Sequence, residues 1–381
     1  MKFNCKRVNL KEAITNVERI ISKQPSLPIL SNILIKSKEG RLLIASTNLE
    51  IAIETYIGAK ITKEGEITIP PRMLSGFLGS IKDEVIEGEI KSNELIIATE
   101  NHNIKIKGMD AKDYPIIPEF PQNFFFKLEA KELNRIMPII LTSVAHNDTR
   151  QELNGIYMGL SKKEVVFAST DSCRLSEGRM KIAIEKKDEF KAFLEETNSI
   201  IVPSLAFSEA SRMLSQGDVK IVINQNQLFL ENNSTRMVSR LINGTYPDYK
   251  QILPDEYAME VKLNKEDFLD ALKITALVAS DNNGEVVLKK TKKGQEMQVF
   301  SQGSESGENK SNIQTEADGE EFEVVFNCRY LIDGLNVIES ANGKVLLKLN
   351  KSKSPVMIRG FDQKEKENTN SSYVIMPIIK E

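Results

Sequence analysis

Three stretches of this chain begin in the same way, and this repetition constrains the fold more than any single residue does. Each opens with a short alternating strand that runs through a polar pair into a helix whose apolar residues recur every three or four positions. The openings start at Phe3, Phe126 and Val261, with separations of 123 and 135 residues. Such spacings are too long for a solenoid repeat and match a whole domain used three times.

Other landmarks recur in the same order. The Ala-Ser-Thr-Asn segment at 45–48 corresponds to Ala-Ser-Thr-Asp at 168–171. Ile69-Pro70-Pro71 corresponds to Ile201-Val202-Pro203 and to Val325-Phe326-Asn327, and each precedes a second helix. Tyr114 and Tyr246, each followed by proline, close the first two copies. The landmarks predict three domains, 1–125, 126–254 and 255–381.

Each copy reads as strand, helix, several strands, helix, strands, which is an α+β unit of two helices and an antiparallel sheet. In the first copy the apolar stripe predicts a helix from Leu10 to Ile21, capped by Asn9 and ended by Pro25, and a second helix from Met73 to Ile81. Alternating segments predict strands at 29–36, 41–46, 49–56, 66–69, 87–91, 94–99 and 103–108.

The other two copies add two local expectations. Pro138 lies within the first helical stripe of the second copy and is expected to bend that helix. The low-complexity segment Gly303–Lys310 in the third copy is expected to be a mobile surface loop.

Composition limits the classes of function. Lys and Arg number 51 and Asp and Glu 54, a net charge of −3, so a protein that binds nucleic acid over its whole surface is disfavoured. The three cysteines, 5, 173 and 328, are scattered and show no metal-ligand spacing, which favours a reducing cytosol. Neither a signal peptide nor an apolar run long enough to cross a membrane is recognisable. We therefore expect a cytoplasmic protein.

Catalytic motifs are weak. The chain has two histidines and lacks HExxH, phosphate-binding glycine loops and GxSxG, and no cofactor or metal is implied. His146 could be a general base oriented by Asp148 in a DNA-processing enzyme. The structural interpretation is a helix-terminal loop with capping side chains, and it is favoured because no nucleophile or metal ligand set accompanies the histidine.

Triplication favours a curved, quasi-symmetric surface over one asymmetric pocket. If strands of neighbouring copies join edge to edge, the free edges are satisfied only when the arc closes, and a second chain could close it as a ring. Leu277 lies opposite the apolar stripe of its helix and is followed by Val278, whereas the sister positions are Arg19 and Thr142. Leu277 and Val278 are therefore predicted interface residues, with Ile104 and Ile106 as counterparts in the first domain.

Several segments resemble the bacterial sliding clamp, the beta subunit of DNA polymerase III, over the full length of the chain. The resemblance is carried by Leu-Pro-Ile-Leu at 27–30, Ala-His-Asn-Asp at 145–148, Leu-Asn-Gly at 153–155, the segment 168–175, Tyr-Pro-Asp-Tyr at 246–249 with Leu253-Pro254, and the tail 373–378. It implies a head-to-tail homodimer in which six similar domains form a ring around duplex DNA. Such a ring is a processivity factor and not an enzyme, and it is nucleoid-associated during replication.

The resemblance also implies where DNA is contacted. Basic side chains facing the hole would give sequence-independent attraction to phosphates. By position, the implied DNA-binding residues are Lys23, Gln24, Arg72, Asn147, Arg150, Asn327, Arg329 and Tyr330. The family usually has arginine where Gln24 stands and basic residues where Met73, Ser204 and Leu205 stand.

The resemblance further implies a cleft between the second and third domains that takes short apolar peptides of the replicative polymerase, the clamp loader and repair proteins. The matching residues are Leu153, Thr170, Cys173, Arg174, Leu175, Pro247, Ile252, Val374, Met376, Pro377 and Ile378. An adaptable methionine suits a site with many ligands. Cys173 stands in place of the usual histidine or tyrosine and Gln251 in place of an arginine, so a wider, less charged pocket is expected. A clamp relative that serves mainly as a scaffold for repair proteins is a further alternative.

Overall fold

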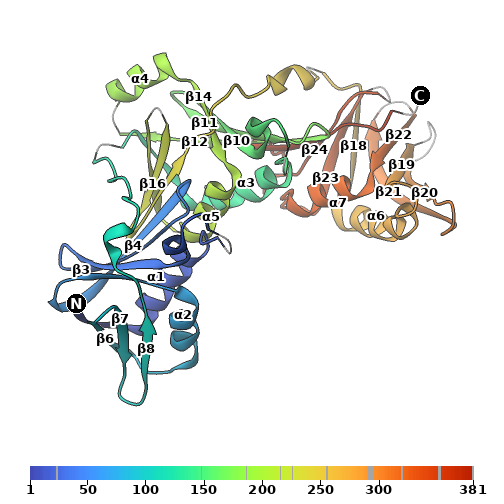
Figure 1. Cartoon of the computed structure of the whole chain (residues 1–381). Coiled ribbons are helices and arrows are strands. Elements are labelled where there is room, and N and C mark those ends of the chain that lie inside the picture. The colour runs from blue at the N-terminus through green and yellow to red at the C-terminus, as the bar shows by residue number, and fades with distance from the viewer. Residues whose placement is uncertain are drawn as a thin grey trace. The chain divides into compact units, whose positions relative to one another are not determined.

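The computed structural model describes residues 1–22, 25–122, 124–146, 148–185, 187–214, 216–224, 226–254, 256–290, 295–318, 321–350 and 353–379. The chain divides into two compact units. Unit 1 comprises Met1–Asn134, Ile182–Glu196 and Leu205–Leu241, and unit 2 comprises Arg135–Lys181, Thr197–Ser204 and Ile242–Glu381. Each unit is built on one antiparallel sheet (Figure 1).

The sheet of unit 1 has thirteen strands within the described part of the chain. They are β1 Lys2–Lys6, β2 Ile33–Lys38, β3 Arg41–Thr47, β4 Ile51–Lys63, β5 Glu66–Ile69, β6 Val85–Lys91, β7 Glu94–Ala98, β8 Asn103–Lys107, β9 Phe126–Glu129, β13 Ala183–Ile184, β15 Asp218–Ile223, β16 Gln227–Asn232 and β17 Thr235–Arg240. The helices α1 Arg7–Glu18 and α2 Pro71–Ser80 pack against each other, and α1 also packs on β3 and β4.

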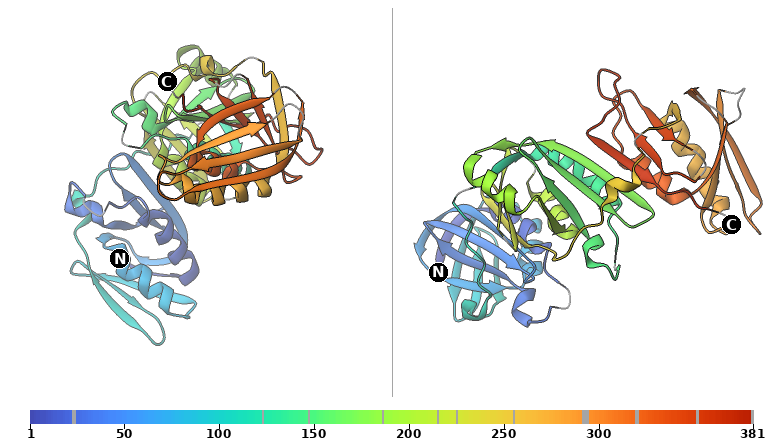
Figure 2. Two further views of the ribbon diagram at one scale, coloured as in Figure 1. Left: turned by 90° about the vertical axis from the view of Figure 1, so that its right-hand side faces the viewer. Right: turned by 90° about the horizontal axis from the view of Figure 1, so that it is seen from above.

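The sheet of unit 2 has twelve strands, counted over the same described residues. They are β10 Gly155–Leu160, β11 Glu164–Thr170, β12 Arg174–Lys181, β14 Ser199–Pro203, β18 Met259–Asn264, β19 Glu285–Lys290, β20 Glu296–Gln302, β21 Glu308–Asp318, β22 Phe322–Asn327, β23 Lys344–Leu349, β24 Val356–Arg359 and β25 Ser371–Ile375. The helices α6 Lys265–Ala279 and α7 Cys328–Val337 lie side by side, and α6 packs on β20 and β21, as can be followed in Figure 2.

The three predicted openings are confirmed as strand followed by helix: β1 and α1, β9 and α3 Ala130–Thr142, and β18 and α6. The predicted cap at Asn9 is wrong, because α1 begins at Arg7 after Lys6, which makes no side-chain cap. At the equivalent position in the third copy, Asn264 does cap, accepting from the backbone N–H of Glu266 and Asp267. Pro138 lies inside α3 as expected.

The recurring serine landmark ties each first helix to its sheet. Ser46 donates a hydrogen bond to the Val17 carbonyl, and Ser169 donates to the Ile140 carbonyl. Both hydroxyls are buried. A buried donor must find an acceptor, so the serine fixes where the helix crosses the strand that carries it.

Strands of neighbouring copies join edge to edge, which is the condition under which the repeat implied closure by a second chain. β17 of the second copy pairs antiparallel with β4 of the first, with Met237 opposite Ile53. β25 of the third copy pairs with β12 of the second, with Tyr373 opposite Ser176. Backbone hydrogen bonds at these two junctions make each unit one continuous sheet.

Two sequence expectations differ from the structure. The segment Gly303–Lys310 is not a plain loop, because Asp281 accepts from the backbone N–H of Glu305 and Ser306, and β21 begins at Glu308. The second copy also has an extra helix, α4 Lys187–Glu196, which buries Phe190 against Phe126 with ring centroids 5.2 Å apart.

Smaller differences concern strand boundaries. The segment predicted as a strand from Ile29 starts with a 3₁₀ turn, η1 Pro28–Ser31, and the strand itself begins at Ile33. The helix α5 Ser204–Met213 follows Pro203 as expected. Among the described residues, no helix combines the length and apolar character needed to span a bilayer.

Two helical glycines give a matched test of the packing. A Cβ on Gly334 in α7 would lie 2.2 and 2.3 Å from ring atoms of the buried Tyr373, whereas a Cβ on Gly76 in α2 meets nothing within 4 Å. We expect Gly334→Ala to lower the free energy of unfolding by about 1–3 kcal/mol through overpacking. Gly76→Ala should instead raise it by about 0.5–1 kcal/mol through helix propensity. Urea denaturation with hydrogen exchange of α7 and α2 measures both, and equal effects would contradict this packing.

Candidate functional site

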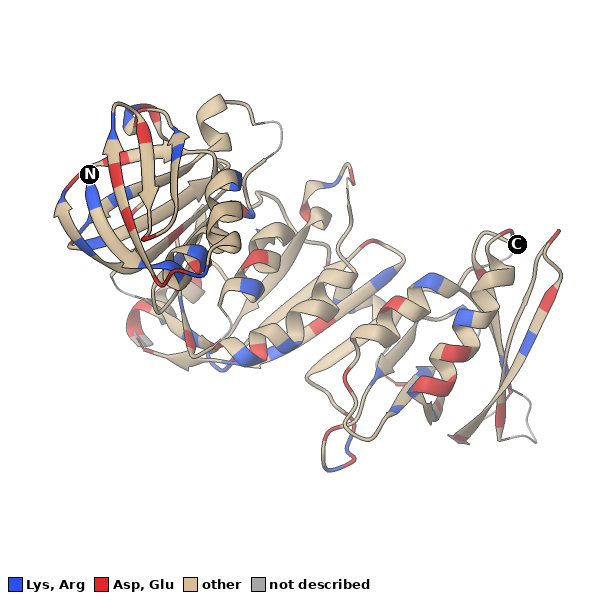
Figure 3. Ribbon diagram, turned by 90° about the horizontal axis from the view of Figure 1, so that it is seen from below, with Lys and Arg blue, Asp and Glu red and all other residues tan. Residues whose placement is uncertain are grey.

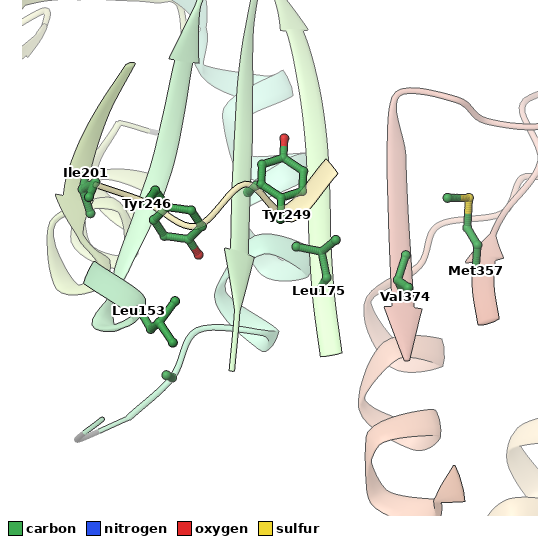
Figure 4. Packing of buried hydrophobic residues seen from close by; sticks show 9 residues of the cluster. Leu153, Leu175, Ile201, Tyr246, Tyr249, Met357 and Val374 are labelled. Atoms are coloured by element: carbon green, nitrogen blue, oxygen red, sulfur yellow. The ribbon is translucent and has the colours of Figure 1, made fainter. Parts of the chain in front are cut away.

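A group of buried apolar side chains in unit 2, here called the tyrosine cluster, includes Leu153, Leu175 and Val374, three of the residues expected to bind peptides. It consists of Ala145, Leu153, Ala168, Leu175, Ile201, Tyr246, Tyr249, Met357 and Val374. Figure 4 shows Leu175 on β12 near Val374 on β25, with Met357 behind on β24. Leu175 and Val374 are direct cross-strand neighbours, so the junction strands form part of the cluster.

Two tyrosines fix the last segment of the second copy. The Tyr246 hydroxyl accepts from the Thr170 backbone N–H at 3.0 Å, and the Tyr249 hydroxyl donates to Glu177 Oε2 at 2.7 Å. Burial raises the pKa of both phenols, so both stay protonated near neutral pH. The ring of Tyr157 lies 5.5 and 5.8 Å from those of Tyr246 and Tyr249. These contacts make a rigid aromatic floor.

The predicted peptide-binding residues differ in how far they are buried. Leu153, Thr170, Leu175, Val374 and Pro377 are buried, Arg174 and Ile378 are half-buried, and Cys173, Pro247, Ile252 and Met376 are exposed. Met376 is 37% and Ile252 44% exposed, so a partner could cover apolar surface on both. We call Cys173 and Met376 the rim pair, because the Met376 N–H donates to the Cys173 carbonyl at 2.8 Å.

Arg174 is the most strongly held charge near the rim. Its Nε lies 2.8 Å from Asp171 Oδ2 and its Nη1 2.8 Å from Asp333 Oδ2. Its guanidinium carbon lies 4.4 Å from the centre of the Tyr330 ring. Tyr330 was expected to meet DNA, but its ring packs on Arg174 and its carbonyl accepts from the Tyr373 hydroxyl at 2.9 Å.

The remaining residues expected at DNA lie at helix starts and loops. Arg72 and Arg329 are exposed in the first turns of α2 and α7, and Leu205 occupies the equivalent turn of α5. Asn327 caps α7, accepting from the Arg329 and Tyr330 N–H groups. Lys23, Gln24 and Asn147 lie outside the described residues.

The structure does not support the alternative of an enzyme centred on His146 and Asp148. The Asp148 carboxylate is held by Arg150, with Nη2 at 3.1 Å from Oδ2 and Nε at 3.3 Å from Oδ1, and this pairing lowers the pKa of Asp148. His146 is exposed. Both Asp148 oxygens are engaged by Arg150, and within the described residues no hydrogen bond joins His146 to this carboxylate. Across the described residues, no group of three or more His, Cys, Asp or Glu side chains is placed to hold a metal.

The predicted interface residues differ in how much surface they offer. Leu277 is 75% exposed and Ile274, one turn earlier on α6, is 51% exposed. Val278 and Ile104 are half-buried. Ile106 is 1% exposed, so its side chain already belongs to the core of its own copy.

Three consecutive parts of the chain match the domains of one family. Residues 1–118 match the N-terminal domain of the DNA polymerase III beta subunit, residues 127–248 its central domain and residues 250–379 its C-terminal domain. The chain belongs to this family. The predicted join at 125/126 lies between two matched segments and that at 254/255 lies just inside the third.

Other beta subunits resemble this chain over nearly their whole length. The beta sliding clamp of Synechocystis sp. is 26% identical over 395 residues, covering 99% of both chains, and that of Bacillus subtilis is 25% identical over 357 residues, covering 91% of this chain and 92% of the relative. The crystal structure of the B. subtilis clamp shares the fold with a TM-score of 0.90 at 23% identity, and a Pseudomonas aeruginosa clamp bound to griselimycin gives 0.89 at 24%; both cover 100% of each chain.

The repeated helices of this chain carry nearly balanced charge. The helices α1, α2, α3, α5, α6 and α7 contain nine basic and eight acidic residues. Basic and acidic residues both occur on the helices of each unit (Figure 3). Met73 and Leu205, where the family commonly has basic residues, are 54% and 44% exposed. Any attraction to DNA must therefore come from individual residues.

Sequence reasoning missed Tyr249 as part of the site, although the Tyr-Pro-Asp-Tyr segment contains it. The sequence signal was the spacing of the two tyrosines, which lie three positions apart on either side of Pro247 and both belong to the cluster. The Glu177 partner could not be found from sequence, because it lies 72 residues away along the chain.

The Tyr249–Glu177 bond gives a test of the cluster. We expect Tyr249→Phe to lower the free energy of unfolding of unit 2 by about 1–2 kcal/mol, because the buried Glu177 loses a donor. Tyr257→Phe is the control, since the Tyr257 hydroxyl meets only the weak acceptor Sδ of Met357 at 3.9 Å, and its effect should be smaller. Urea denaturation of both variants decides; equal losses would contradict the role of the Glu177 bond.

Proposed function

We propose that this protein is a sliding clamp, two copies of which close head to tail around duplex DNA and hold the replicative polymerase on its template. The single observation that carries the proposal is the repeated strand junction. Two junctions within the chain are formed, and the matching edges for a third are present at the two ends of the repeat. A chain built this way satisfies its last edges by binding a second copy.

The free edges are those of β21 and β8. Among the described residues, β21 pairs with β20 over 308–314 and with β18 over 315–318, which leaves its other edge unpaired at 308–311. The equivalent edge of β4 pairs with β17, and the equivalent edge of β12 pairs with β25. At the opposite end of the repeat, β8 pairs with β7 alone within the described chain, so its second edge is unpaired there.

The existing junctions supply a register for the missing one. β8, β17 and β25 are each followed by a residue that bonds to the strand before the second helix: Met109 to Thr68, Ile242 to Ile201 and Ile378 to Val325. Ile104, Met237 and Tyr373 each lie five residues before these bonded positions, so the three residues are equivalent. The turns before β4, β12 and β21 make Asn309 equivalent to Ile53 and Ser176. Ile104 should therefore lie opposite Asn309 of a second copy.

Cross-linking tests this register. In a Cys173→Ser background, which removes the exposed thiol, the pair Ile104→Cys and Asn309→Cys should form a covalent dimer under mild oxidation, because directly opposite residues have Cβ atoms about 4.5–5.5 Å apart. Lys105→Cys with Asn309→Cys is the control, since its side chain points to the other face of the strand. Equal cross-linking of both pairs, or none, would contradict the register.

Leu277 gives a second handle on the same contact. Leu277→Asp should place a charge in the interface beside Ile274 and weaken the dimer. Light scattering after size exclusion should then give a mass near 42.9 kDa for the variant and twice that for the unmodified chain. If the unmodified chain is monomeric at micromolar concentration, the proposed dimeric ring is contradicted.

Contact with DNA is proposed for the exposed arginines at helix starts. A positive side chain in the first turn is electrostatically unfavourable, because the helix N-terminus already carries partial positive charge. Arg72 and Arg329 occupy this position on α2 and α7, and neither first turn contains an acidic residue. A backbone phosphate placed at the start of α2 would meet both Arg72 and N–H groups that no side chain caps, whereas at α7 the N–H groups of Arg329 and Tyr330 already donate to Asn327 and only the Arg329 side chain is offered. Arg150 and the residues outside the described part complete the proposed DNA surface, and the near-neutral helices suit a weak, sliding contact.

Topological retention tests the clamp. We expect the protein, loaded at high concentration onto a nicked circular plasmid, to co-elute with the DNA in gel filtration and to be lost once the circle is cut at a single site, because a ring slides off a free end. The control is the Leu277→Asp variant, which should not be retained on either DNA. Retention that survives linearisation would instead indicate tight conventional binding.

Partner binding is proposed at the rim of the tyrosine cluster. The exposed Met376 and Ile252 offer apolar surface over a rigid floor, which suits short peptides that insert a few side chains. Polymerase, clamp-loader and repair-protein peptides are the proposed ligands. A protein that binds such peptides without being retained on circular DNA would be a repair scaffold instead. As a clamp it has no catalytic role of its own and works in the cytoplasm on the chromosome.

A further inference from the structure

We propose that Arg174 is a positioning residue that holds the rim pair in place for partner peptides by joining the end of β12 to α7, without touching the peptide itself. The inference rests on the proposed function, because it concerns the same peptide site. It assigns Asp171, Asp333, Tyr330 and Tyr373 as the other members of one network.

The network engages Nε, Nη1 and one face of the guanidinium. One edge donates to Asp171, and Nη1 donates to Asp333 and reaches the Tyr373 hydroxyl at 3.5 Å. The Tyr330 ring covers one face. The Arg174 side chain is only 13% exposed, so a peptide passing over the rim meets its neighbours first.

The first junction shows that this network is not needed to pair the strands. At the equivalent positions Ile51 replaces Arg174, Ala206 replaces Tyr330 and Met237 replaces Tyr373. The acidic position on the helix, Glu209, is turned to Arg212 at 2.7 Å. β4 and β17 nevertheless pair in the same register as β12 and β25.

The turn itself is also shared. Asn48 Oδ1 accepts from the N–H groups of Glu50 and Ile51, as Asp171 Oδ1 does from those of Cys173 and Arg174. The backbone turn thus forms with or without an arginine. What the arginine adds is the connection from this turn to α7, and it is added at the junction that carries the tyrosine cluster.

The connection reaches the rim through two short steps. Cys173, next to Arg174, accepts from the Met376 N–H, so the rim pair moves with the turn. α7 is held through two of its own residues: Asp333 accepts from Arg174, and the Tyr330 carbonyl accepts from the Tyr373 hydroxyl. Because Arg174 fixes both parts at once, the exposed Met376 is held in place before a ligand arrives, which lowers the ordering cost of binding.

A double-mutant cycle tests the inference with the full-length protein, using griselimycin as the probe and calorimetry as the measurement. Arg174→Ala should weaken binding at least tenfold, and Arg174→Lys less, because a lysine can reach one carboxylate but cannot bridge two. Asp333→Asn should also weaken binding although Asp333 lies beyond the rim. The double variant should be no weaker than Arg174→Ala alone. Lys344→Ala, which breaks the exposed Lys344–Glu316 pair, is the control and should leave affinity unchanged.

Hydrogen exchange of α7 in the ligand-free protein gives a second readout. We expect the α7 amides to exchange at least tenfold faster in Arg174→Ala and at the unmodified rate in Lys344→Ala. If Arg174→Ala weakens binding while Asp333→Asn does not, Arg174 contacts the ligand directly and the inference is overturned. Unchanged α7 exchange overturns it as well. If the unmodified protein does not bind griselimycin, the proposed peptide site fails, and the exchange of α7 still decides the role of Arg174.

Discussion

The pairing of strand edges between successive copies is the interaction on which the rest of the structure depends. β17 completes β4, and β25 completes β12, in the same antiparallel register. Each junction turns two separate domains into one sheet, and the backbone groups that would be exposed at an edge are satisfied there. The proposed peptide site depends on Leu175 and Val374, which meet across one of these junctions.

The equivalent junctions are kept alike in backbone and made different in side chains. Glu177 is buried at the second junction and bound by Tyr249, whereas its counterpart Glu54 is partly desolvated, which raises its pKa, and lies opposite Arg236. Arg174 occupies a place that Ile51 fills with apolar surface. The repeated backbone thus carries the architecture, while single substitutions at fixed positions give one junction a site that the other lacks.

The repeat was readable from the sequence because it rests on local patterns: apolar periodicity, a serine after a strand, a proline before a helix. These predicted the strand and helix at each opening and raised edge-to-edge joining as the condition for a closed ring. Asn9 misled because it is a good cap residue that lies two positions beyond the true helix start at Arg7. The extra helix α4 and the Tyr330–Arg174 stack were not predictable, since both depend on contacts between residues far apart in the chain. The proposed peptide-site residues come from the resemblance, and which of them are buried and which are exposed could be seen only in the coordinates.

The shared direction of the junctions has a consequence for the proposed ring. Every junction joins the last strand of one copy to the same edge of the copy before it, so closing with a second chain relates the chains by a rotation axis that runs along the hole. Such an axis cannot exchange the two flat sides of the ring. Both C-terminal tails, with Met376, then emerge on one side only. The ring would have a front and a back, and a polymerase bound to it could face only one way along the duplex.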